Sequence, residues 1–81
     1  SEATPAQARL FAPGAGAKTD TDRARKILTA FARRAFRRPA TQAEVARLVA
    51  LYNVARKNGD SFERGIQLGV QATLASPNFL Y

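Results

Sequence analysis

Arginine is the residue type with the clearest chemical potential in this sequence, and it is concentrated in the stretch "FARRAFRRPAT". Arg33, Arg34, Arg37 and Arg38 form a near-repeat with two phenylalanines. A guanidinium group is always charged and binds carboxylates or phosphates through a planar fork of N–H donors. The four arginines therefore either hold an anionic partner or form the solvated side of a helix whose phenylalanines face a core.

Other reactive side chains are scarce. The chain has no His, Cys, Met or Trp, which excludes disulfides, thiolate or imidazole metal ligands, and Cys or His as a nucleophile or proton carrier. The "GAG" at residues 14–16 is too little for a phosphate-binding loop, because no Gly-Lys-Ser/Thr ending follows and no strand precedes it. We therefore predict no cofactor and no metal site.

The carboxylates do not form a catalytic pair either. Most of them lie at expected helix starts, where a side-chain oxygen caps free N–H groups or a negative charge meets the helix dipole. We predict no catalytic residue and no enzymatic activity. The six carboxylates are Glu2, Asp20, Asp22, Glu44, Asp60 and Glu63.

Size and charge set the remaining limits. The 81 residues make one small domain, which buries only about 60% of its unfolded surface. The net charge of +7 and the pI near 11.2 favour nucleic acid or other anionic partners in principle. No apolar run approaches the roughly 20 residues that span a bilayer, so no membrane span is expected.

Residues 1–19 are rich in Ala, Gly and Pro and show no sustained period. This composition predicts a linker or irregular arm, with Leu10 and Phe11 as its docking side chains. A first helix is expected to begin near Asp20 or Thr21 and to stop before Pro39, since the residue before a proline is pushed out of the helical region. Its apolar positions recur at helical spacing: Ala24, Ile27, Leu28, Phe31 and Ala35.

Two further helices follow after short connections. Thr41 and Glu44 have the spacing of a capping box, and Asn58-Gly59 closes the second helix. Asp60 is expected to cap the third helix, which ends at Ser76-Pro77, and the final "PNFLY" folds back as a turn. The expected buried positions are Val45, Leu48, Val49, Tyr52 and Ala55 in the second helix and Phe62, Ile66, Val70 and Thr73 in the third.

These patterns predict an all-α domain at residues 20–81, a three-helix antiparallel bundle preceded by the irregular arm. At about 100° per residue, Lys26, Arg33 and Arg37 lie opposite the apolar stripe of the first helix. The favourable interaction of cations with the helix end and the repulsion between neighbouring arginines nearly cancel, so helix stability alone does not explain them. A solvated or paired face is the simpler interpretation; in a sharper form, some arginines meet carboxylates of neighbouring domains.

The third helix carries a stripe of small side chains, at Gly65, Gly69, Ala72 and Ser76. Glycine within a helix costs about 0.5–1 kcal/mol relative to alanine, so two of them indicate close approach of another backbone, inside the domain or outside it. We favour the internal contact. Together with the arginines and the apolar C-terminus, the candidate interaction surface comprises Arg33, Arg34, Arg37, Arg38, Gly65, Leu68, Gly69, Ala72, Phe79 and Tyr81.

The segments "RARKILTAFARRAFRRPAT", "EVARLVALYNVARKNG" and "SFERGIQLGVQATLASPNFLY" resemble, in order and spacing, the planctomycete-type domain of unknown function that is the fifth of the planctomycete-specific set. The resemblance covers about residues 21–81. It implies an extracytoplasmic, periplasmic or secreted location, within large bacterial proteins that also carry c-type cytochrome and carbohydrate-binding-like modules. It implies no catalytic residue. Some relatives carry cysteines where this chain has Ala12 and Arg23, so their disulfide does not transfer.

The leading hypothesis is a non-catalytic structural or interaction module, whose partners are neighbouring domains of the same polypeptide. A small basic nucleic-acid-binding domain is the alternative. The starts of the second and third helices, Gln42-Ala43-Glu44 and Ser61-Phe62-Glu63, are not basic, as a recognition helix would require. Nucleic acid is therefore the less favoured partner, and the sequence leaves the oligomeric state open.

Overall fold

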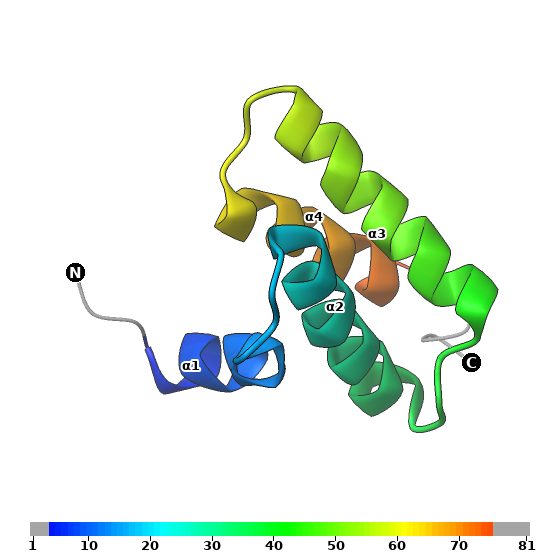
Figure 1. The fold of residues 1–81 in the computed structure, drawn as a ribbon. Coiled ribbons are helices and arrows are strands. Elements are labelled where there is room, and N and C mark those ends of the chain that lie inside the picture. The colour runs from blue at the N-terminus through cyan, green and yellow to red at the C-terminus, as the bar shows by residue number, and fades with distance from the viewer. Residues whose placement is uncertain (1–3, 76–81) are drawn as a thin grey trace.

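A computed structural model describes residues 4–75, apart from the side chain of residue 7. Every regular element in this part of the chain is helical, which confirms the all-α class. The elements are α1 (Pro5–Phe11), the short 3₁₀ helix η1 (Ala12–Gly14), α2 (Asp20–Phe36), α3 (Gln42–Lys57) and α4 (Phe62–Leu74), shown in Figure 1. The sequence predicted three helices, whereas four α-helices are present.

The additional helix, α1, lies in the segment that was expected to be irregular. Its Leu10 and Phe11 pack against the core as predicted. η1 then brings Gly14 onto α2, where a Cβ at Gly14 would lie only 2.6 Å from Cγ of Arg23. The prediction of an irregular arm was wrong because α1 is too short, at seven residues, to show a helical period, and its stability comes from docking on α2.

α2 begins at Asp20, as predicted, but its N-cap lies one residue before the capping residues that the sequence suggested. Oγ1 of Thr19, rather than the side chain of Asp20 or Thr21, accepts the N–H of Asp22 at 3.1 Å. Asp20 and Asp22 lie in the first turn, where the helix dipole favours negative charge. The helix ends at Phe36, and Arg37 takes a left-handed conformation with φ of 59°. The chain therefore leaves the helix before it reaches Pro39.

α3 starts and ends as the sequence predicted. Oγ1 of Thr41 accepts the N–H of Glu44, and the Glu44 carboxylate accepts the N–H of Thr41, which together make the capping box. At the other end Gly59 adopts φ of 91°, a conformation that is open to glycine at little cost. The five residues expected to be buried, Val45, Leu48, Val49, Tyr52 and Ala55, are the buried residues of this helix.

α4 is capped by Ser61, whose Oγ accepts the N–H of Arg64 at 3.1 Å, and not by Asp60. Both residue types cap helices well, so sequence spacing alone did not separate two adjacent candidates. The helix ends at Leu74. The predicted terminator Ser76-Pro77 and the predicted turn after it lie outside the described residues.

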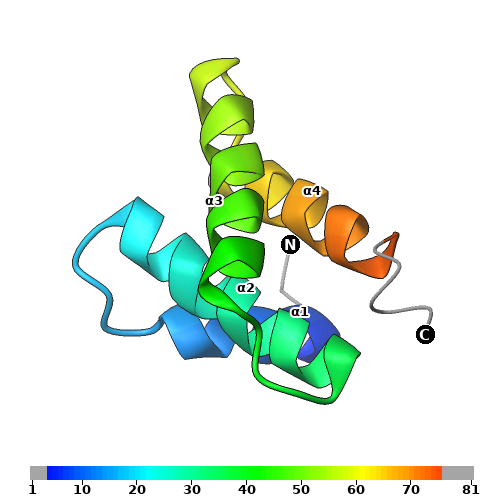
Figure 2. The ribbon, with the colours of Figure 1, turned by 90° about the vertical axis from the view of Figure 1, so that its right-hand side faces the viewer.

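The core forms where the three long helices meet, and each of them packs against the other two. Consecutive long helices run in opposite general directions, but their axes are inclined to one another (Figures 1 and 2). One prediction for α2 was wrong: Ala32 is fully buried, whereas Phe31 and Ala35 are only half-buried. Val70 of α4 is likewise half-buried. The main core cluster is Ala24, Ile27, Leu28, Ala32, Leu48, Tyr52, Phe62 and Ile66.

Candidate interaction surfaces

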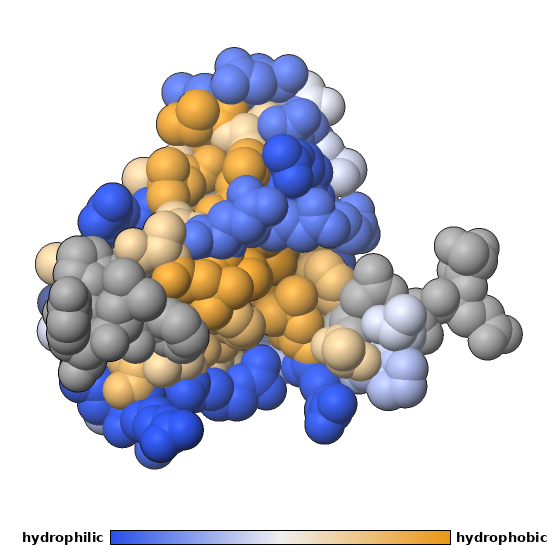
Figure 3. Space-filling model, turned by 180° about the vertical axis from the view of Figure 1, so that it is seen from behind, coloured by the Kyte–Doolittle hydropathy of each residue, from blue (hydrophilic) through white to orange (hydrophobic). Residues whose placement is uncertain are grey.

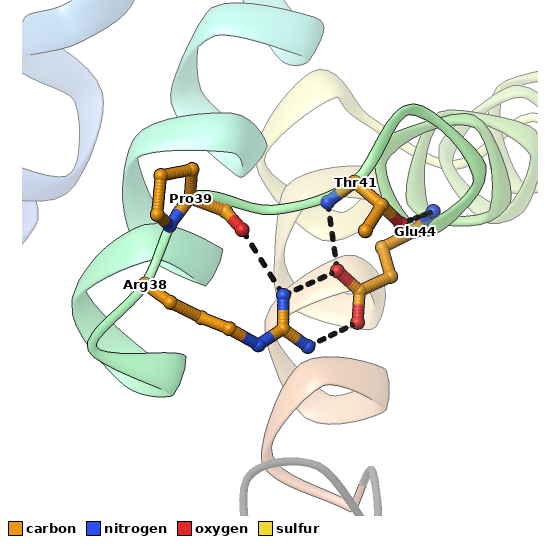
Figure 4. Close-up of polar contacts among 4 residues, drawn as sticks. All are labelled: Arg38, Pro39, Thr41 and Glu44. Carbon is orange, nitrogen blue, oxygen red and sulfur yellow. Dashed lines mark hydrogen bonds and ion pairs between the residues drawn. The ribbon is translucent and has the colours of Figure 1, made fainter.

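Arg38 belongs to a polar cluster inside the domain (Figure 4). Its Nη1 and Nη2 donate to Oε1 and Oε2 of Glu44 at 3.0 and 2.8 Å, and Nη1 also donates to the carbonyl of Pro39. The same carboxylate accepts the N–H of Thr41 in the capping box. The hydrogen bonds to the Glu44 carboxylate are the main reason why the pKa of Arg38 is raised. Arg38 therefore fastens the end of α2 to the start of α3.

The other three arginines of the repeat point elsewhere. Arg33, Arg34 and Arg37 are exposed, and none of them forms an ion pair within the described part of the chain. Arg37 lies past the end of α2 in the left-handed region, so it does not share a helical face with Arg33 as predicted. That conformation costs a non-glycine residue about 1–2 kcal/mol, and it turns the chain so that Arg38 reaches Glu44.

Two shallow depressions on α2 involve these exposed cations. One lies between α2 and the segment after α1, has a volume of about 480 Å³, and includes the basic residues Arg25, Lys26 and Arg33 among its lining. The other lies between α1 and α2, has a volume of about 440 Å³, and is lined by Ala6, Arg9, Leu10, Phe31 and Arg34. Within the basic repeat, Arg38 thus forms an ion pair inside the domain, whereas Arg33, Arg34 and Arg37 face the solvent.

The glycine stripe of α4 faces the interior of the domain. A Cβ at Gly65 would lie 2.7 Å from Cδ1 of Tyr52 in α3, and one at Gly69 would lie 2.7 Å from Cδ2 of Leu28 in α2. The close approach that the sequence indicated is therefore real. At Gly65 it involves the ring of Tyr52 and also its backbone carbonyl oxygen, 3.5 Å from a Cβ placed there, and at Gly69 it involves the side chain of Leu28. Leu68 and Ala72 are half-buried, while Phe79 and Tyr81 lie outside the described residues.

The eight candidate residues that lie within the described range consequently do not form one surface. The exposed arginines project into solvent from the end of α2, whereas Gly65 and Gly69 are buried against Tyr52 and Leu28. Because side chains of the domain itself occupy the space above Gly65 and Gly69, no partner can pack against these glycines. What remains accessible from the predicted set, among the described residues, is Arg33, Arg34 and Arg37 with the exposed portions of Arg38, Leu68 and Ala72.

An aromatic cluster joins the arm to the core. The ring of Phe62 lies 5.5 Å from that of Tyr52, edge to face, and 6.2 Å from that of Phe11. The Arg23 guanidinium sits 4.4 Å above the Phe62 ring, where a cation is attracted to the ring face. Burial is the main cause that raises the pKa of Tyr52, and the positive charge of Arg56 acts in the opposite direction. The cluster is structural, and it uses one more arginine internally.

The outer face of α3 is a surface that the sequence analysis missed. Five of its ten exposed residues are apolar, with 57% of Val54 and 37% of Leu51 accessible, and the other five are Gln42, Arg47, Asn53, Arg56 and Lys57. Alanines continue this apolar face toward the start of the helix. The sequence contained the pattern of this face, because apolar residues fall on both sides of the helix. The prediction considered only the stripe that is buried. The α3 outer face comprises Ala43, Ala46, Ala50, Leu51 and Val54, all of them exposed.

Charges border this apolar face. Arg47 and Lys57 are exposed on α3, and its acidic residue Glu44 is engaged at the N-terminus by Arg38. Apolar surface also gathers on the face seen from behind Figure 1, where Figure 3 shows it framed by hydrophilic side chains above and below. In α4, Leu74 is 43% exposed. The described residues thus leave apolar surface exposed outside α3 as well.

Neither a cluster of possible metal ligands nor a helix suited to span a membrane occurs among the described residues. No group of three His, Cys, Asp or Glu side chains comes together within residues 4–75. None of the helices in that range is both long and apolar enough to cross a bilayer. The geometry described so far supports packing and association.

Comparisons with known proteins agree with the resemblance noted from the sequence. No curated protein and no solved structure matches the chain. A family model described as "PSD5: Protein of unknown function (DUF1595)" matches residues 23–81, from the first turn of α2 onward. Because the match covers most of the chain, the protein belongs to the PSD5 family of proteins of unknown function.

Proposed function

We propose that this domain is a non-catalytic interaction module, which docks within a larger extracytoplasmic, cytochrome-associated bacterial polypeptide. The observation that carries the proposal is the apolar α3 outer face. Apolar surface that is left exposed on the outer side of a helix is a place where a partner can pack, and among the described residues α3 is covered by its own domain on one side alone. Docking against a neighbouring domain would cover the other.

The gain from covering this face is adequate for association. Fully burying a Leu or Val side chain contributes about 1.5–3 kcal/mol, and Leu51 and Val54 still expose 37% and 57% of their surface. The alanines that precede them on this face let a partner helix approach closely. Close packing over a small area is the kind of contact that neighbouring domains of one polypeptide make.

A second copy of the same chain is a poorer partner for the α3 outer face. Each copy carries a net charge of +7, and like charges of this size oppose self-association at low ionic strength. Arg47 and Lys57 flank the face in both copies. A neighbouring domain with an apolar patch and a few carboxylates meets neither obstacle.

The location and the molecular context rest on the sequence resemblance. Planctomycete-type domains of this kind occur inside large extracytoplasmic proteins with c-type cytochrome modules, and the family match supports applying that context here. The absence of Cys from the chain is compatible with an oxidising compartment, which permits disulfides without requiring them. The redox chemistry would then belong to other modules, and this domain would position them.

The test is association between this domain and the remainder of the polypeptide that carries it, measured by isothermal titration calorimetry. Val54→Lys and Val54→Glu should each weaken binding at least tenfold, because either charge would be buried in an apolar contact. Gln71→Lys, at an exposed position of α4, is the matched control and should bind as the wild type does. Absence of wild-type association, or wild-type affinity in both Val54 variants, would refute the proposed docking.

Nucleic-acid binding is the second candidate, and one observation favours it: the depression that includes Arg25, Lys26 and Arg33 is strongly basic. Against it, every aromatic side chain within residues 4–75 is at least half-buried, so none is free to stack on bases. We expect duplex DNA to bind weakly and without sequence preference, and to dissociate near 150 mM salt, because phosphate attraction alone would hold it. Tight, sequence-dependent binding at that salt concentration would favour the alternative.

A further inference from the structure

The depression between α1 and α2, here called the α1–α2 groove, has an apolar floor and a cationic rim. Leu10 and Phe31 are half-buried at its floor, with Ala6 beside them, and Arg9 and Arg34 complete the lining. Its volume of about 440 Å³ would accommodate one or two side chains of a partner. None of the described residues that line it carries a carboxylate.

The two rim arginines have no ion-pair partner among the described residues. Both are exposed, and neither forms a hydrogen bond or ion pair to a side chain in the described part of the chain. Arg38, only four residues after Arg34, shows what such a group does when a carboxylate is within reach: it binds Glu44 through two hydrogen bonds of 3.0 and 2.8 Å. Paired hydrogen bonds of this kind are strong and directional.

Phe31 is an apolar side chain of the groove that the described residues leave partly uncovered. Its position in the helical stripe predicted a core residue, yet the structure buries Ala32 completely and leaves Phe31 partly accessible in the groove. A partly exposed phenylalanine gains from being covered, because burial of aromatic surface stabilises association. The groove therefore combines a partly exposed apolar floor with arginines that have no ion-pair partner among the described residues.

We propose that the α1–α2 groove binds an acidic amphipathic segment of a partner protein. An apolar side chain of that segment covers Leu10 and Phe31, while its carboxylates pair with Arg9 and Arg34. The inference rests on the proposed docking function and adds the chemistry of one partner surface. A nucleic-acid backbone fits less well, because a phosphodiester chain carries no apolar side chain for the floor. A second copy fits less well because both chains carry a net charge of +7.

The test uses three labelled synthetic helical peptides and fluorescence anisotropy at about 150 mM salt, where long-range attraction is largely screened. The first peptide presents Leu and Glu on one face, the second has Ser in place of each Leu, and the third has Lys in place of each Glu. We expect the Leu/Glu peptide to bind the 81-residue chain at least tenfold more tightly than either control. Equal binding of the Ser/Glu peptide would overturn the proposal in favour of charge alone, and absence of binding would also overturn it.

Two charge-reversal variants locate the binding. Arg34→Glu should weaken binding of the Leu/Glu peptide at least tenfold, whereas Arg47→Glu, an equal change of charge at an exposed position of α3, should alter it less than threefold. An equal loss in both variants would show a net-charge effect and refute the groove. Circular dichroism establishes that each variant is folded, and Arg9→Glu provides a second groove variant if Arg34→Glu is not.

This experiment fails separately from the test of the proposed function. If Val54→Lys abolishes association with the remainder of the polypeptide while Arg34→Glu leaves peptide binding unchanged, the docking module stands and the groove does not bind acidic segments. If the groove binds the Leu/Glu peptide but the remainder of the polypeptide does not associate at all, the partner is a different protein.

Discussion

Helices α3 and α4 each carry a stripe of small residues, and the two stripes have opposite roles. In α4, Gly65 and Gly69 face inward, and the side chains of Tyr52 and Leu28 fill the space above them. In α3, Ala46 and Ala50 face outward and are exposed. Similar periodicity therefore produces a closed internal contact in one helix and an open surface in the other.

This contrast shows that small residues at helical spacing indicate a close approach but do not identify the group that packs against them. α4 has too little space for any Cβ at Gly65, because the ring of Tyr52 is itself fully buried and cannot move away freely. α3 has no neighbour on its outer side within the described residues. Alanine there retains helix propensity while keeping the surface flat enough for another helix.

The largest expected effect comes from filling the α4 stripe. Gly65→Leu should lower the free energy of unfolding by about 3 kcal/mol or more, because the new side chain must displace Tyr52 or push α3 and α4 apart. Such a loss is a large fraction of the stability of a small domain. Urea unfolding followed by circular dichroism measures it.

The matched control adds a leucine side chain to the outer stripe instead. Ala46→Leu should change the free energy of unfolding by less than about 0.5 kcal/mol, as expected for an exposed helical position. If the two leucine variants proved equally stable, the distinction between an inner and an outer stripe would be wrong.

The N-terminal caps of the two helices provide an intermediate effect. Thr41→Ala removes one half of the capping box of α3 and loosens the Glu44 carboxylate that Arg38 binds. We expect a loss of about 1–2 kcal/mol. Ser61→Ala removes the single side-chain bond at the start of α4 and should cost less, near 1 kcal/mol. Thermal melts of both variants compare them, and a larger loss at Ser61 would contradict the ranking.

A smaller effect should appear only at alkaline pH, at the contact between α3 and α4. Burial raises the pKa of Tyr52 above its ordinary value of 10.0, so the unfolded chain releases this proton first. The corresponding stability is present below pH 10.0 and is lost as the pH rises through the folded-state pKa. Tyr52→Phe should keep the packing and remove this contribution to the pH dependence. Urea melts from pH 8 to 11 test it, and identical alkaline slopes would count against the burial of the hydroxyl group.

The smallest effect on stability is expected at the α3 outer face. Val54→Lys places a charge at a position that is 57% exposed, so the free energy of unfolding should change by less than about 0.5 kcal/mol. The same variant should lose docking. A thermal melt beside the calorimetric titration separates the two properties, and a strongly destabilised Val54→Lys would mean that this face is already covered within the domain.

The sequence by itself determined the helical class, the positions of the three long helices and much of the core. Apolar spacing predicted the buried face of α3 completely, because a long helix repeats its pattern over several turns. The capping box at Thr41 and Glu44 was also readable, since it depends on residues three positions apart. The sequence also identified Gly65 and Gly69 as points of close approach. These features follow from local geometry, which neighbouring residues along the chain specify.

Only the tertiary structure decided which partner each residue meets. α1 is too short to be recognised from its pattern, and it is positioned by the packing of Leu10 and Phe11 on the core. The duplicated arginines look alike in sequence, yet Arg38 reaches Glu44 because the chain turns through Arg37 toward α3, while Arg34 remains at the rim of a groove. The side of α2 that meets the other helices buries Ala32 completely and leaves Phe31 half-buried, although Phe31 belongs to the apolar stripe that the sequence predicted. Such choices depend on the relative placement of helices, which is set by packing among residues distant in the chain.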